Sequence, residues 1–389
     1  MEKQMRKDAP LSGLKVVELA RILAGPWLGQ ALADLGAEVI KVEAPEGDDT
    51  RQWGPPFVER PCLDGGTERS AAYFHAANRG KHSITADFRT EAGRERVRAL
   101  VAQADILIEN FKVGGLAKYG LDYESLSALN PRLIYCSITG FGQDGPYASR
   151  AGYDFLIQGM SGLMSVTGEP DQPPQKVGVA VTDIVTGLYG AVGVLAAVEQ
   201  RHRTGRGQHL DLSLLDCAVA LMANQAMNVL ASGEAPRRLG NAHPNIVPYQ
   251  AVPAADGWII LAVGNDGQFA RLCEVLGLAG LAADPAYATN PARVAHRATL
   301  MPLLEAATRR WPAAELLAAL EAATVPAGPI NDLAGVFADP QVVARGLRIT
   351  PEGVPGVRGP WRFSDAELRL DRAAPRLGGD DATPDSAPG

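Results

Sequence analysis

The sequence predicts an α/β protein with a large part built on a mostly parallel β-sheet and a smaller α/β part. Short segments rich in Val, Ile and Leu alternate with amphipathic helical segments through residues 14–139. The pattern changes near Gly152, and a second group of one strand and several helices follows residue 248. The length of 389 residues is enough for about two domains.

The first strand, loop and helix follow from the order of apolar and turn-forming residues. Residues 14–20 form a short run rich in Val and Leu, which indicates a strand. Pro26 is a favourable first residue for a helix, and apolar residues at helical spacing follow it as far as Gly36. Residues 37–42 are the next predicted strand, and the polar, turn-rich segment at 46–56 is either a binding loop or a surface excursion.

The alternation continues before residue 140. Strands are predicted at residues 83–88, 104–108 and 133–139, with helices at 91–103 and 123–129. Strands separated by helices at this spacing favour a parallel sheet with helices on both faces. Ligands of such sheets bind beyond the carboxyl ends of the strands. We therefore expect the site in the loops at residues 21–25, 43–57 and 109–115.

The second half of the chain is predicted to be mainly helical. Helices are expected at residues 153–164, 184–202, 214–230, 268–276, 293–308 and 313–323, and one clear strand at 258–263. A polar segment with three prolines, residues 233–248, has the composition of a connector. The tail from residue 374 has few apolar side chains and is expected to be disordered.

Charge and cysteine spacing argue against several classes of protein. Thirty-seven Lys and Arg against 44 Asp and Glu leave a net charge of −7, so no basic excess is available for nucleic acid. The four cysteines are too far apart in sequence for a thiolate metal motif. The first residues do not resemble a secretory signal, and the longest apolar run, about 188–198, is too short to span a bilayer. We expect a cytoplasmic protein that binds neither nucleic acid nor membranes.

Two residues stand out as candidates for chemistry, although no short catalytic or nucleotide motif occurs. The sequence has no G-x-G-x-x-G after the first strand, and no P-loop, G-x-S-x-G or H-E-x-x-H motif. Asp183 lies where an apolar run meets the start of a long predicted helix, and on this pattern alone a helix cap by Thr182 or Asp183 is the simpler interpretation. His243, in a predicted loop, is either a pocket residue or a solvated surface residue.

Several long motifs in a consistent order resemble those of the family III CoA-transferases, a group that also contains the α-methylacyl-CoA racemases. The motifs are LSGLKVVEL at 11–19, AGP at 24–26, LGAEVIKVE at 35–43, ENF at 109–111 and RTGRGQ at 203–208. Within the family the chain is most similar to the succinate–hydroxymethylglutarate CoA-transferases. That likeness rests on DDTR at 48–51, WGPPF at 53–57, AGYD at 151–154, SGLM at 161–164 and IVPYQ at 246–250.

The resemblance implies a Rossmann-like large domain built from both ends of the chain and a small α/β domain formed by the segment between them. It also implies an interlocked homodimer. The expected division is a large domain at 1–205, a connector at 206–245, the small domain at 246–330, a return to the large domain at 331–375 and a disordered tail at 376–389. The implied substrates are an acyl-CoA and a carboxylic acid, with no metal and no permanently bound cofactor.

The resemblance also assigns the site residues. Asp183 matches the catalytic aspartate, a nucleophile that suits thioesters because a thiolate leaves without a proton. The matching CoA-binding positions are Arg21, Leu23, Ala24, Arg89, Asn110, Phe111 and Lys118. The likeness further implies succinyl-CoA or glutaryl-CoA as donor and a short dicarboxylic acid as acceptor. Candidates to contact the acyl group or its distal carboxylate are Arg51, Arg150, Tyr153 and His243.

Two departures from the family pattern bear on function. Ala44 replaces an arginine that many members carry after the I-K-V-E segment, and one hypothesis is that Arg51 supplies the lost phosphate contact. Tyr153 stands where the racemases have a histidine, and a tyrosine is a poor base at neutral pH. The resemblance therefore favours CoA transfer, with racemase activity and a CoA-binding protein without activity as the alternatives.

Overall fold

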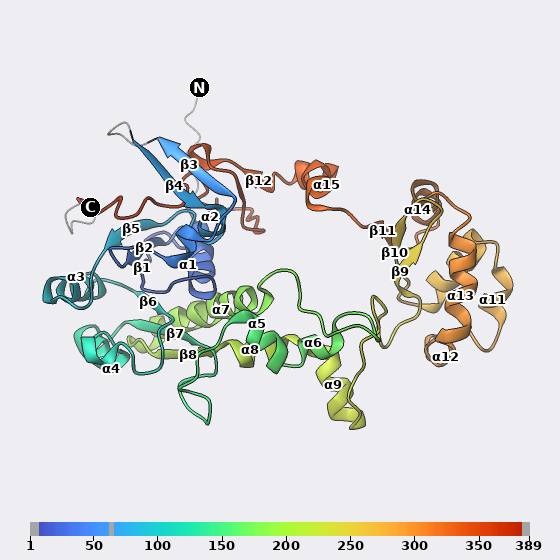
Figure 1. The fold of residues 1–389 in the computed structure, drawn as a ribbon, viewed down its shortest axis with the longest axis horizontal. Helices are drawn as coiled ribbons and strands as arrows, with labels where there is room; N and C mark the ends of the chain where they lie inside the picture. Colours follow the sequence, from blue (N-terminus) through green and yellow to red (C-terminus); the bar gives the residue numbers. More distant parts are fainter. Residues whose placement is uncertain (1–7, 62–65, 383–389) are drawn as a thin grey trace. The chain divides into compact units, whose positions relative to one another are not determined.

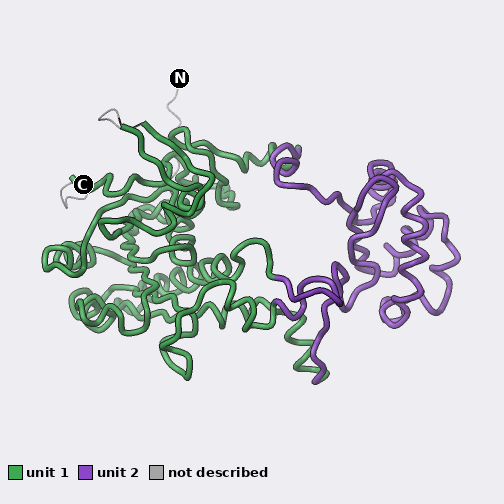
Figure 2. Tube along the Cα trace, in the orientation of Figure 1, with its two compact units in different colours: residues 1–163, 176–232, 340–389 green, residues 164–175, 233–339 purple. Residues whose placement is uncertain are grey.

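The computed structural model describes residues 8–61 and 66–382, which form two compact units. Unit 1 comprises Met1–Leu163, Lys176–Ser232 and Pro340–Gly389, and unit 2 comprises Met164–Gln175 and Gly233–Asp339 (Figure 2). Unit 1 is therefore assembled from segments far apart in the sequence. It also includes residues 206–232, which the domain division expected from the resemblance gave to a connector.

Unit 1 is built on a six-stranded sheet in the order β5-β2-β1-β6-β7-β8, in which every neighbouring pair is parallel. The strands are β1 (Lys15–Glu18), β2 (Glu38–Glu43), β5 (His82–Thr85), β6 (Ile106–Glu109), β7 (Ile134–Thr139) and β8 (His209–Ser213). The mostly parallel sheet is confirmed. The sequence pattern does not predict β8, because its alternation of apolar and polar residues is short and follows a Gly-rich turn.

Helices cover both faces of this sheet (Figure 1). They are α1 (Ala24–Asp34) and α7 (Val181–Thr204) on one face, and α3 (Glu91–Val101) and α4 (Tyr123–Leu129) on the other. Side chains alternate across a strand, so Val16 packs in the core below α1 and α7 whereas Val17 packs below α3 and α4. The four central strands, β2, β1, β6 and β7, thus each contribute to two separate hydrophobic cores.

By length and composition, α7 is apolar enough to cross a membrane. The same holds for the bent pair of α8 (Leu214–Leu221) and α9 (Ala223–Ser232) taken together. In the structure α7 packs closely on α1 instead. Thr186 and Val194 are buried, and a Cβ added at Gly187 would lie 2.8 Å from the carbonyl oxygen of Ala24. This packing against the sheet and α1 accounts for the apolar composition of α7.

The remaining elements of unit 1 are short. They are η1 (Asp49–Gln52), β3 (Phe57–Pro61), β4 (Thr67–Ala71), α2 (Ala72–Ala77), η2 (Ala117–Tyr119), α5 (Asp154–Met160), α8 (Leu214–Leu221), α9 (Ala223–Ser232), α16 (Pro340–Ala344), β12 (Arg348–Ile349), η3 (Pro351–Gly353) and β13 (Gly356–Val357). Between the two units, α6 (Leu163–Val166) spans the point where the chain leaves unit 1.

Unit 2 is a three-stranded antiparallel sheet, β11-β10-β9, with helices packed on it. Its elements are β9 (Tyr249–Pro253), β10 (Trp258–Ala262), α10 (Asp266–Val275), α11 (Ala279–Ala283), α12 (Asn290–Ala295), α13 (Arg297–Thr308), α14 (Ala313–Ala322), β11 (Ala327–Pro329) and α15 (Leu333–Ala338). The predicted strand at 258–263 is confirmed as β10. The pattern misses β9 and β11, which pair with it.

The C-terminal segment runs along β5, the edge strand of the large sheet. Asp380 Oδ2 accepts a hydrogen bond from Ser83 N at 2.9 Å, and Asp380 N donates to Ser83 O at 2.9 Å. Asp381 Oδ1 accepts from Thr85 N at 2.8 Å. These bonds occupy polar backbone groups that an edge strand otherwise leaves open. The structure differs here from the expected disordered tail, of which residues 383–389 lie outside the described residues.

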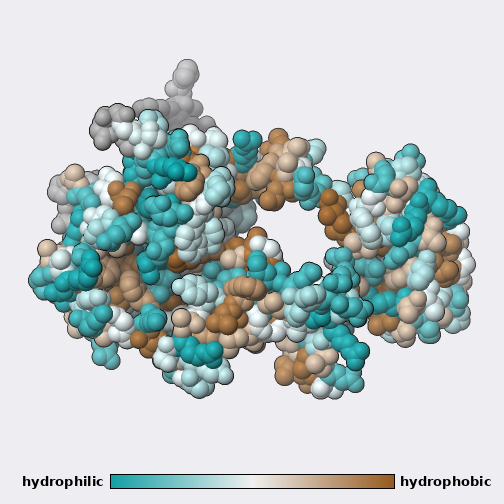
Figure 3. Space-filling view, viewed as in Figure 1, coloured by the Kyte–Doolittle hydropathy of each residue, from teal (hydrophilic) through white to brown (hydrophobic). Residues whose placement is uncertain are grey.

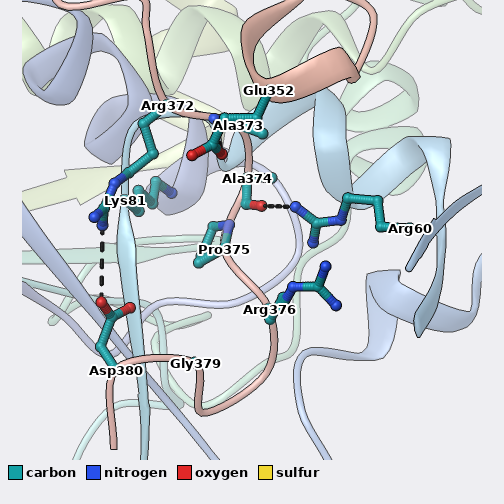
Figure 4. A pocket seen from close by; sticks show the side chains of 10 residues that line it. All are labelled: Arg60, Lys81, Glu352, Arg372, Ala373, Ala374, Pro375, Arg376, Gly379 and Asp380. Atoms are coloured by element: carbon teal, nitrogen blue, oxygen red, sulfur yellow. Dashed lines mark hydrogen bonds and ion pairs between the residues drawn. The ribbon is translucent and has the colours of Figure 1, made fainter. Parts of the chain in front are cut away.

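Three arginines make further contacts in this region: Arg60 from β3, and Arg372 and Arg376 from the C-terminal segment itself. Arg60 Nη1 donates to the carbonyl oxygen of Ala374 at 2.8 Å, and Arg372 Nη1 lies 3.8 Å from Asp380 Oδ1 (Figure 4). Arg376 Nη2 donates to a backbone carbonyl of β3 at 2.5 Å. These contacts attach the C-terminal segment to parts of the chain some 300 residues earlier.

Replacing Asp380 and Asp381 together with Ala should uncover the β5 edge. The loss of their backbone hydrogen bonds should cost about 1–3 kcal/mol of unfolding free energy and promote self-association. Urea unfolding and static light scattering measure the two effects. Glu367→Ala, which removes an exposed carboxylate earlier in the same segment, is the control. Identical unfolding midpoints for the double variant and the control would contradict this role of the tail.

Candidate active site

Two buried lysines and two buried carboxylates meet below the loop that follows β1. Glu18 and Lys41 are register partners on β1 and β2, and Lys41 Nζ lies 3.2 Å from Glu18 Oε1 and 2.9 Å from Asp48 Oδ2. Lys81 Nζ lies 2.8 Å from Glu18 Oε2 and donates to Pro26 O at 2.9 Å. The side chains of all four charged residues are buried. The two positive charges balance the two negative charges, as burial at this depth requires.

This charged cluster holds the loop at residues 20–26 in one conformation. Lys41 Nζ donates to Ala20 O at 2.9 Å, and Ile22 N donates to Asp48 Oδ2 at 3.2 Å. Ile22 has a φ of 72°, in the left-handed region that a β-branched residue adopts only under constraint. The hydrogen bonds from the cluster supply that constraint.

The loop after β1 meets the loop after β6 where the order of the sheet reverses. The chain continues from β1 to β2 on one side and from β6 to β7 on the other, so a crevice forms at the carboxyl ends of β1 and β6. Arg21 N donates to Asn110 Oδ1 at 2.9 Å, and Asn110 Nδ2 donates to Arg21 O at 2.7 Å. This reciprocal pair joins the two loops.

A cavity of about 260 Å³ opens at this crevice. Among its lining residues are Arg21, Leu23, Ala24, Asn110, Phe111, Lys112, Thr139, Arg150, Tyr153 and Asp183. The structure thus brings together five of the seven CoA-binding positions that the resemblance implies, two of the four acyl-pocket candidates and the matched aspartate.

Asp183 lies in the first turn of α7 and does not cap the helix. The N-cap residue is Ala180, and no side chain caps this end. Among the residues that the structure describes, no donor bonds the Asp183 carboxylate. Burial raises the pKa of Asp183 to about 7, and the negative charge of Asp154 adds to the effect. The capping interpretation therefore does not describe this residue.

Asp154, at the start of α5, binds the first turn of α7 in place of a cap. Asp154 Oδ1 accepts hydrogen bonds from Thr182 N at 2.8 Å and Thr182 Oγ1 at 2.6 Å, and Oδ2 accepts from Gln158 Nε2 at 2.7 Å. The neighbouring carboxylates therefore differ: Asp154 is fully bonded and orients the helix, whereas Asp183 is left without a donor at the cavity. A carboxylate without donors keeps its electron density for an electrophile.

Arg51 is placed away from the cavity, contrary to both roles expected of it. Its Nη2 lies 2.7 Å from Glu43 Oε1, its Nε donates to Glu43 Oε2 at 2.8 Å, and its guanidinium stacks 3.7 Å from the ring centre of Phe74. Burial acts to raise the pKa of Glu43, but the positive charges of Arg51 and Lys41 outweigh burial, so the pKa is lowered overall. A guanidinium that is 4% exposed and paired in this way is not available to a phosphate or an acyl carboxylate.

Three other expected residues are not in the lining of this cavity. Arg89 is exposed and its Nε lies 2.8 Å from Asp87 Oδ1. Lys118, on η2, has its Nζ 4.8 Å from the ring centre of Tyr119. His243 belongs to unit 2, whereas all lining residues belong to unit 1.

Sequence reasoning missed the charged cluster, although a signal for it exists. Lys41 sits within the apolar run at 37–42, and Glu18 within the run at 14–20. A charged residue in the middle of a buried parallel strand requires a partner of opposite charge on a neighbouring strand.

Comparison with known proteins identifies the family. The family model described as CoA-transferase family III matches residues 11–381. The chain belongs to CoA-transferase family III. It is 60% identical to the succinate–glutarate CoA-transferase of Agrobacterium fabrum over 96% of this chain and 94% of that protein, and 42% identical to the human succinyl-CoA:glutarate CoA-transferase over 97% and 85%. A CAIB/BAIF family protein from Brucella suis has a crystal structure with a TM-score of 0.86, 64% identity and coverage of 97% and 98%.

The family III assignment makes this chain a CoA-transferase, an enzyme whose substrates are CoA thioesters and carboxylic acids. The mixed α/β structure, its six-stranded parallel sheet and the likeness to the CAIB/BAIF protein confirm the expected α/β fold class. The cavity at the β1–β6 crevice lies where a doubly wound sheet binds ligands.

Lys41→Met should destabilise the CoA-transferase strongly, because it leaves Glu18 and Asp48 buried opposite Lys81 alone. Breaking a buried charge pair from one side costs about 3–5 kcal/mol of unfolding free energy. Lys176→Met, at an exposed position, is the control. Chemical denaturation measures both variants, and equal stability of the two would refute the role of the cluster.

Asp183→Asn should stabilise the protein above neutral pH. In the wild type the folded pKa of about 7 exceeds the unfolded value, so the stability gained by protonating Asp183 is complete below about pH 4 and lost as pH rises to 7. Asn does not titrate. The variant should therefore exceed the wild type by up to about 4 kcal/mol at pH 8, with the difference closing toward pH 4. Melting curves across this range test it, and a difference independent of pH would contradict the raised pKa.

Proposed function

We propose that this enzyme transfers CoA between an acyl-CoA and a carboxylic acid through a covalent intermediate on Asp183. The observation that carries the proposal is the position of this carboxylate, without a hydrogen-bond donor among the described residues, in the cavity formed by the loops after β1 and β6. Family membership supplies the reaction class. The geometry supports Asp183 as the group that reacts.

The chemistry proceeds in steps that each need only a carboxylate and a thiolate. Asp183 attacks the thioester carbonyl, which forms a mixed anhydride and releases the CoA thiolate. The thiolate attacks the Asp183 carbonyl of the anhydride, which gives an aspartyl-CoA thioester and frees the donor acid. The acceptor carboxylate attacks this thioester, and the thiolate then returns to the acceptor acyl group. The acceptor's attack forms a second mixed anhydride, and thiolate attack on its acceptor carbonyl gives the new acyl-CoA and regenerates the Asp183 carboxylate. One Asp183 oxygen leaves with the donor acid, and one oxygen of the acceptor replaces it.

CoA is proposed to lie along the crevice. Leu23, Ala24 and Phe111 offer apolar surface, and Asn110 is already fixed between the two loops. Arg21 Nη1 now lies 2.9 Å from Asp49 Oδ2 in an exposed pair, which a phosphate can replace at little cost. Arg89 and Lys118, outside the cavity, remain proposed contacts for the outer phosphates.

Incubation with an acyl-CoA in the absence of acceptor should label Asp183. Hydroxylamine converts an activated aspartyl group to a hydroxamate, and peptide mass spectrometry locates the change. Asp183→Ala should lose labelling and reduce turnover by at least about three orders of magnitude, because the nucleophile is gone. Asp154→Asn is the matched control and should still be labelled at position 183. Label on Asp154 or Glu43 would sink the assignment.

The acceptor is proposed to be a short dicarboxylic acid, with succinyl-CoA or glutaryl-CoA as donor. Relatives named for succinate, glutarate and citramalate support this choice. In the cavity, Arg150 is exposed and stacks 4.5 Å from the ring centre of Tyr147, which leaves its guanidinium edge available for a distal carboxylate. Tyr153 can add a hydroxyl group.

A comparison of kcat/KM for glutarate and butyrate with one fixed donor tests the dicarboxylate proposal. A cation at the far end of the pocket should favour glutarate by roughly ten- to a hundredfold, because butyrate leaves it unpaired. Arg150→Gln should reduce the glutarate value and leave the butyrate value nearly unchanged. A wild-type preference for butyrate would remove the dicarboxylate proposal and leave the transferase mechanism intact.

We further propose that the enzyme is a cytoplasmic homodimer without a permanently bound cofactor. The surface of unit 1 carries apolar side chains over α5 and α9 (Figure 3). Phe155 on α5 is 59% exposed and Leu230 on α9 is 78% exposed, more than a monomer surface usually leaves to large apolar residues. Light scattering coupled to size-exclusion chromatography measures the mass of the particle, and a monomer at micromolar concentration would contradict the dimer.

A further inference from the structure

Three polar side chains line up on one face of the large sheet beside the proposed CoA cavity. Glu109, the last residue of β6, is the register partner of Ser137 on β7. His209 on β8 is paired with Tyr135, two residues before Ser137, so its side chain emerges on the same face. This is the face covered by α3 and α4, and the polar group sits at its carboxyl edge.

Hydrogen bonds link these side chains to the backbone of the loop after β6. Glu109 Oε2 accepts from Phe111 N at 2.8 Å, and the hydroxyl of Ser137 bonds the same carboxyl group. Ser137 Oγ lies 2.9 Å from His209 Nε2. The chain of bonds therefore runs from β8 through β7 to Phe111, which lines the proposed CoA cavity.

The direction of the bonds follows from the charge states of Glu109 and His209 together. Its ring stacks on Tyr123 with ring centres 5.0 Å apart, and burial lowers its pKa although Asp211 acts in the opposite sense. An ionised Glu109 carboxylate can only accept, so the Ser137 hydroxyl donates to it and the neutral His209 ring donates from Nε2 to Ser137 Oγ. Glu109 thus collects two donors, Ser137 and the amide of Phe111, which together suit an ionised carboxylate.

We propose that Glu109 is a positioning residue for CoA binding: its carboxylate fixes the amide of Phe111 and so holds the loop after β6 in its binding conformation. The inference rests on the proposed function, because it takes the cavity at the β1–β6 crevice as the CoA site. Asn110 joins this loop to Arg21 on one side, and Glu109 anchors it to the sheet on the other.

The anchor is strongest when Glu109 carries its charge. A protonated carboxyl group accepts more weakly from the Phe111 amide and competes with Ser137 as a donor. Burial raises the pKa of Glu109 to about 7, with the hydrogen bonds of Ser137 and Phe111 opposing the rise and Asp211 adding to it. The other titratable or charged groups around it are Lys112, Asp122, Tyr123, Tyr135, Cys136 and His209.

Coupling between charge and loop position gives CoA binding a proton signature. CoA favours the ionised form, so binding near pH 7 releases protons from Glu109. A weaker bond in the protonated form should lower CoA affinity about fivefold at pH 6 relative to pH 8. The corresponding release near pH 7 is about 0.4 proton per CoA bound.

Titration calorimetry of free coenzyme A in buffers of different ionisation enthalpy measures this release. Asp183→Asn is used as the reference protein, so that the carboxyl group in the cavity whose pKa burial raises to about 7 is absent. Adding Glu109→Gln, which accepts from Phe111 but does not ionise, should remove about 0.4 proton from the release and flatten the excess pH dependence. Protons released by the CoA phosphates are common to both proteins and cancel in the difference.

A second variant makes the prediction directional. Ser137→Ala removes a donor to the carboxylate and should raise the pKa of Glu109, which moves the pH midpoint of CoA affinity upward. Equal proton release with Glu and Gln at position 109, or no shift in Ser137→Ala, would overturn the positioning role. Failure of the reference protein to bind free coenzyme A, with no protection of the β1–β6 loops in hydrogen exchange, would instead overturn the proposed CoA site.

Discussion

The balanced charges of Glu18, Asp48, Lys41 and Lys81 are the constraint on which the candidate site depends. Taking four charged groups out of water is unfavourable, and the cluster is tolerable only because its members satisfy one another within 3.2 Å. In return its spare donors and acceptors bind the backbone of the loop at 20–26. A site made from loops is thereby given the rigidity of the sheet beneath it.

Asp183 shows the opposite arrangement only one helix away. The buried lysines have carboxylates within contact distance, whereas Asp183 has another carboxylate, Asp154, as its charged neighbour. Asp154 performs the stabilising work at the start of α7 through Thr182, so Asp183 is released from it. The fold thus carries a buried carboxylate without a donor among the described residues at the position of the proposed nucleophile, and the stabilising contacts are made by a different residue.

Local sequence patterns predicted the parts of the structure that depend on local causes. The strands at β1, β2, β5, β6 and β7 coincide with apolar runs between turn residues, and the topology rule pointed to the loops after β1 and β6. Two predictions were wrong: Arg51 does not line the cavity, and the tail up to residue 382 is not disordered. Both errors arise because contacts between residues distant in sequence fix these segments. A sequence window around Arg51 does not contain Phe74 or Pro375, and one around Asp380 does not contain Ser83. Pairings of this kind exist only once the sheet has formed.

The order of the sheet explains why one crevice receives contributions from so many segments. After β1 the chain passes to α1 on one face, and after β6 it passes to α4 on the other, so neither connection covers the space between their carboxyl ends. Asn110 bridges that space with two hydrogen bonds to Arg21, and α7 brings Asp183 to its rim from the α1 face. Neither α1 nor α4 packs over the loops after β1 and β6, so contacts from the sheet below must hold these loops in place. Glu18, Lys41 and Lys81 hold the β1 side and Glu109 holds the β6 side, so both walls of the cavity are fixed by side chains whose charge is buried in the sheet.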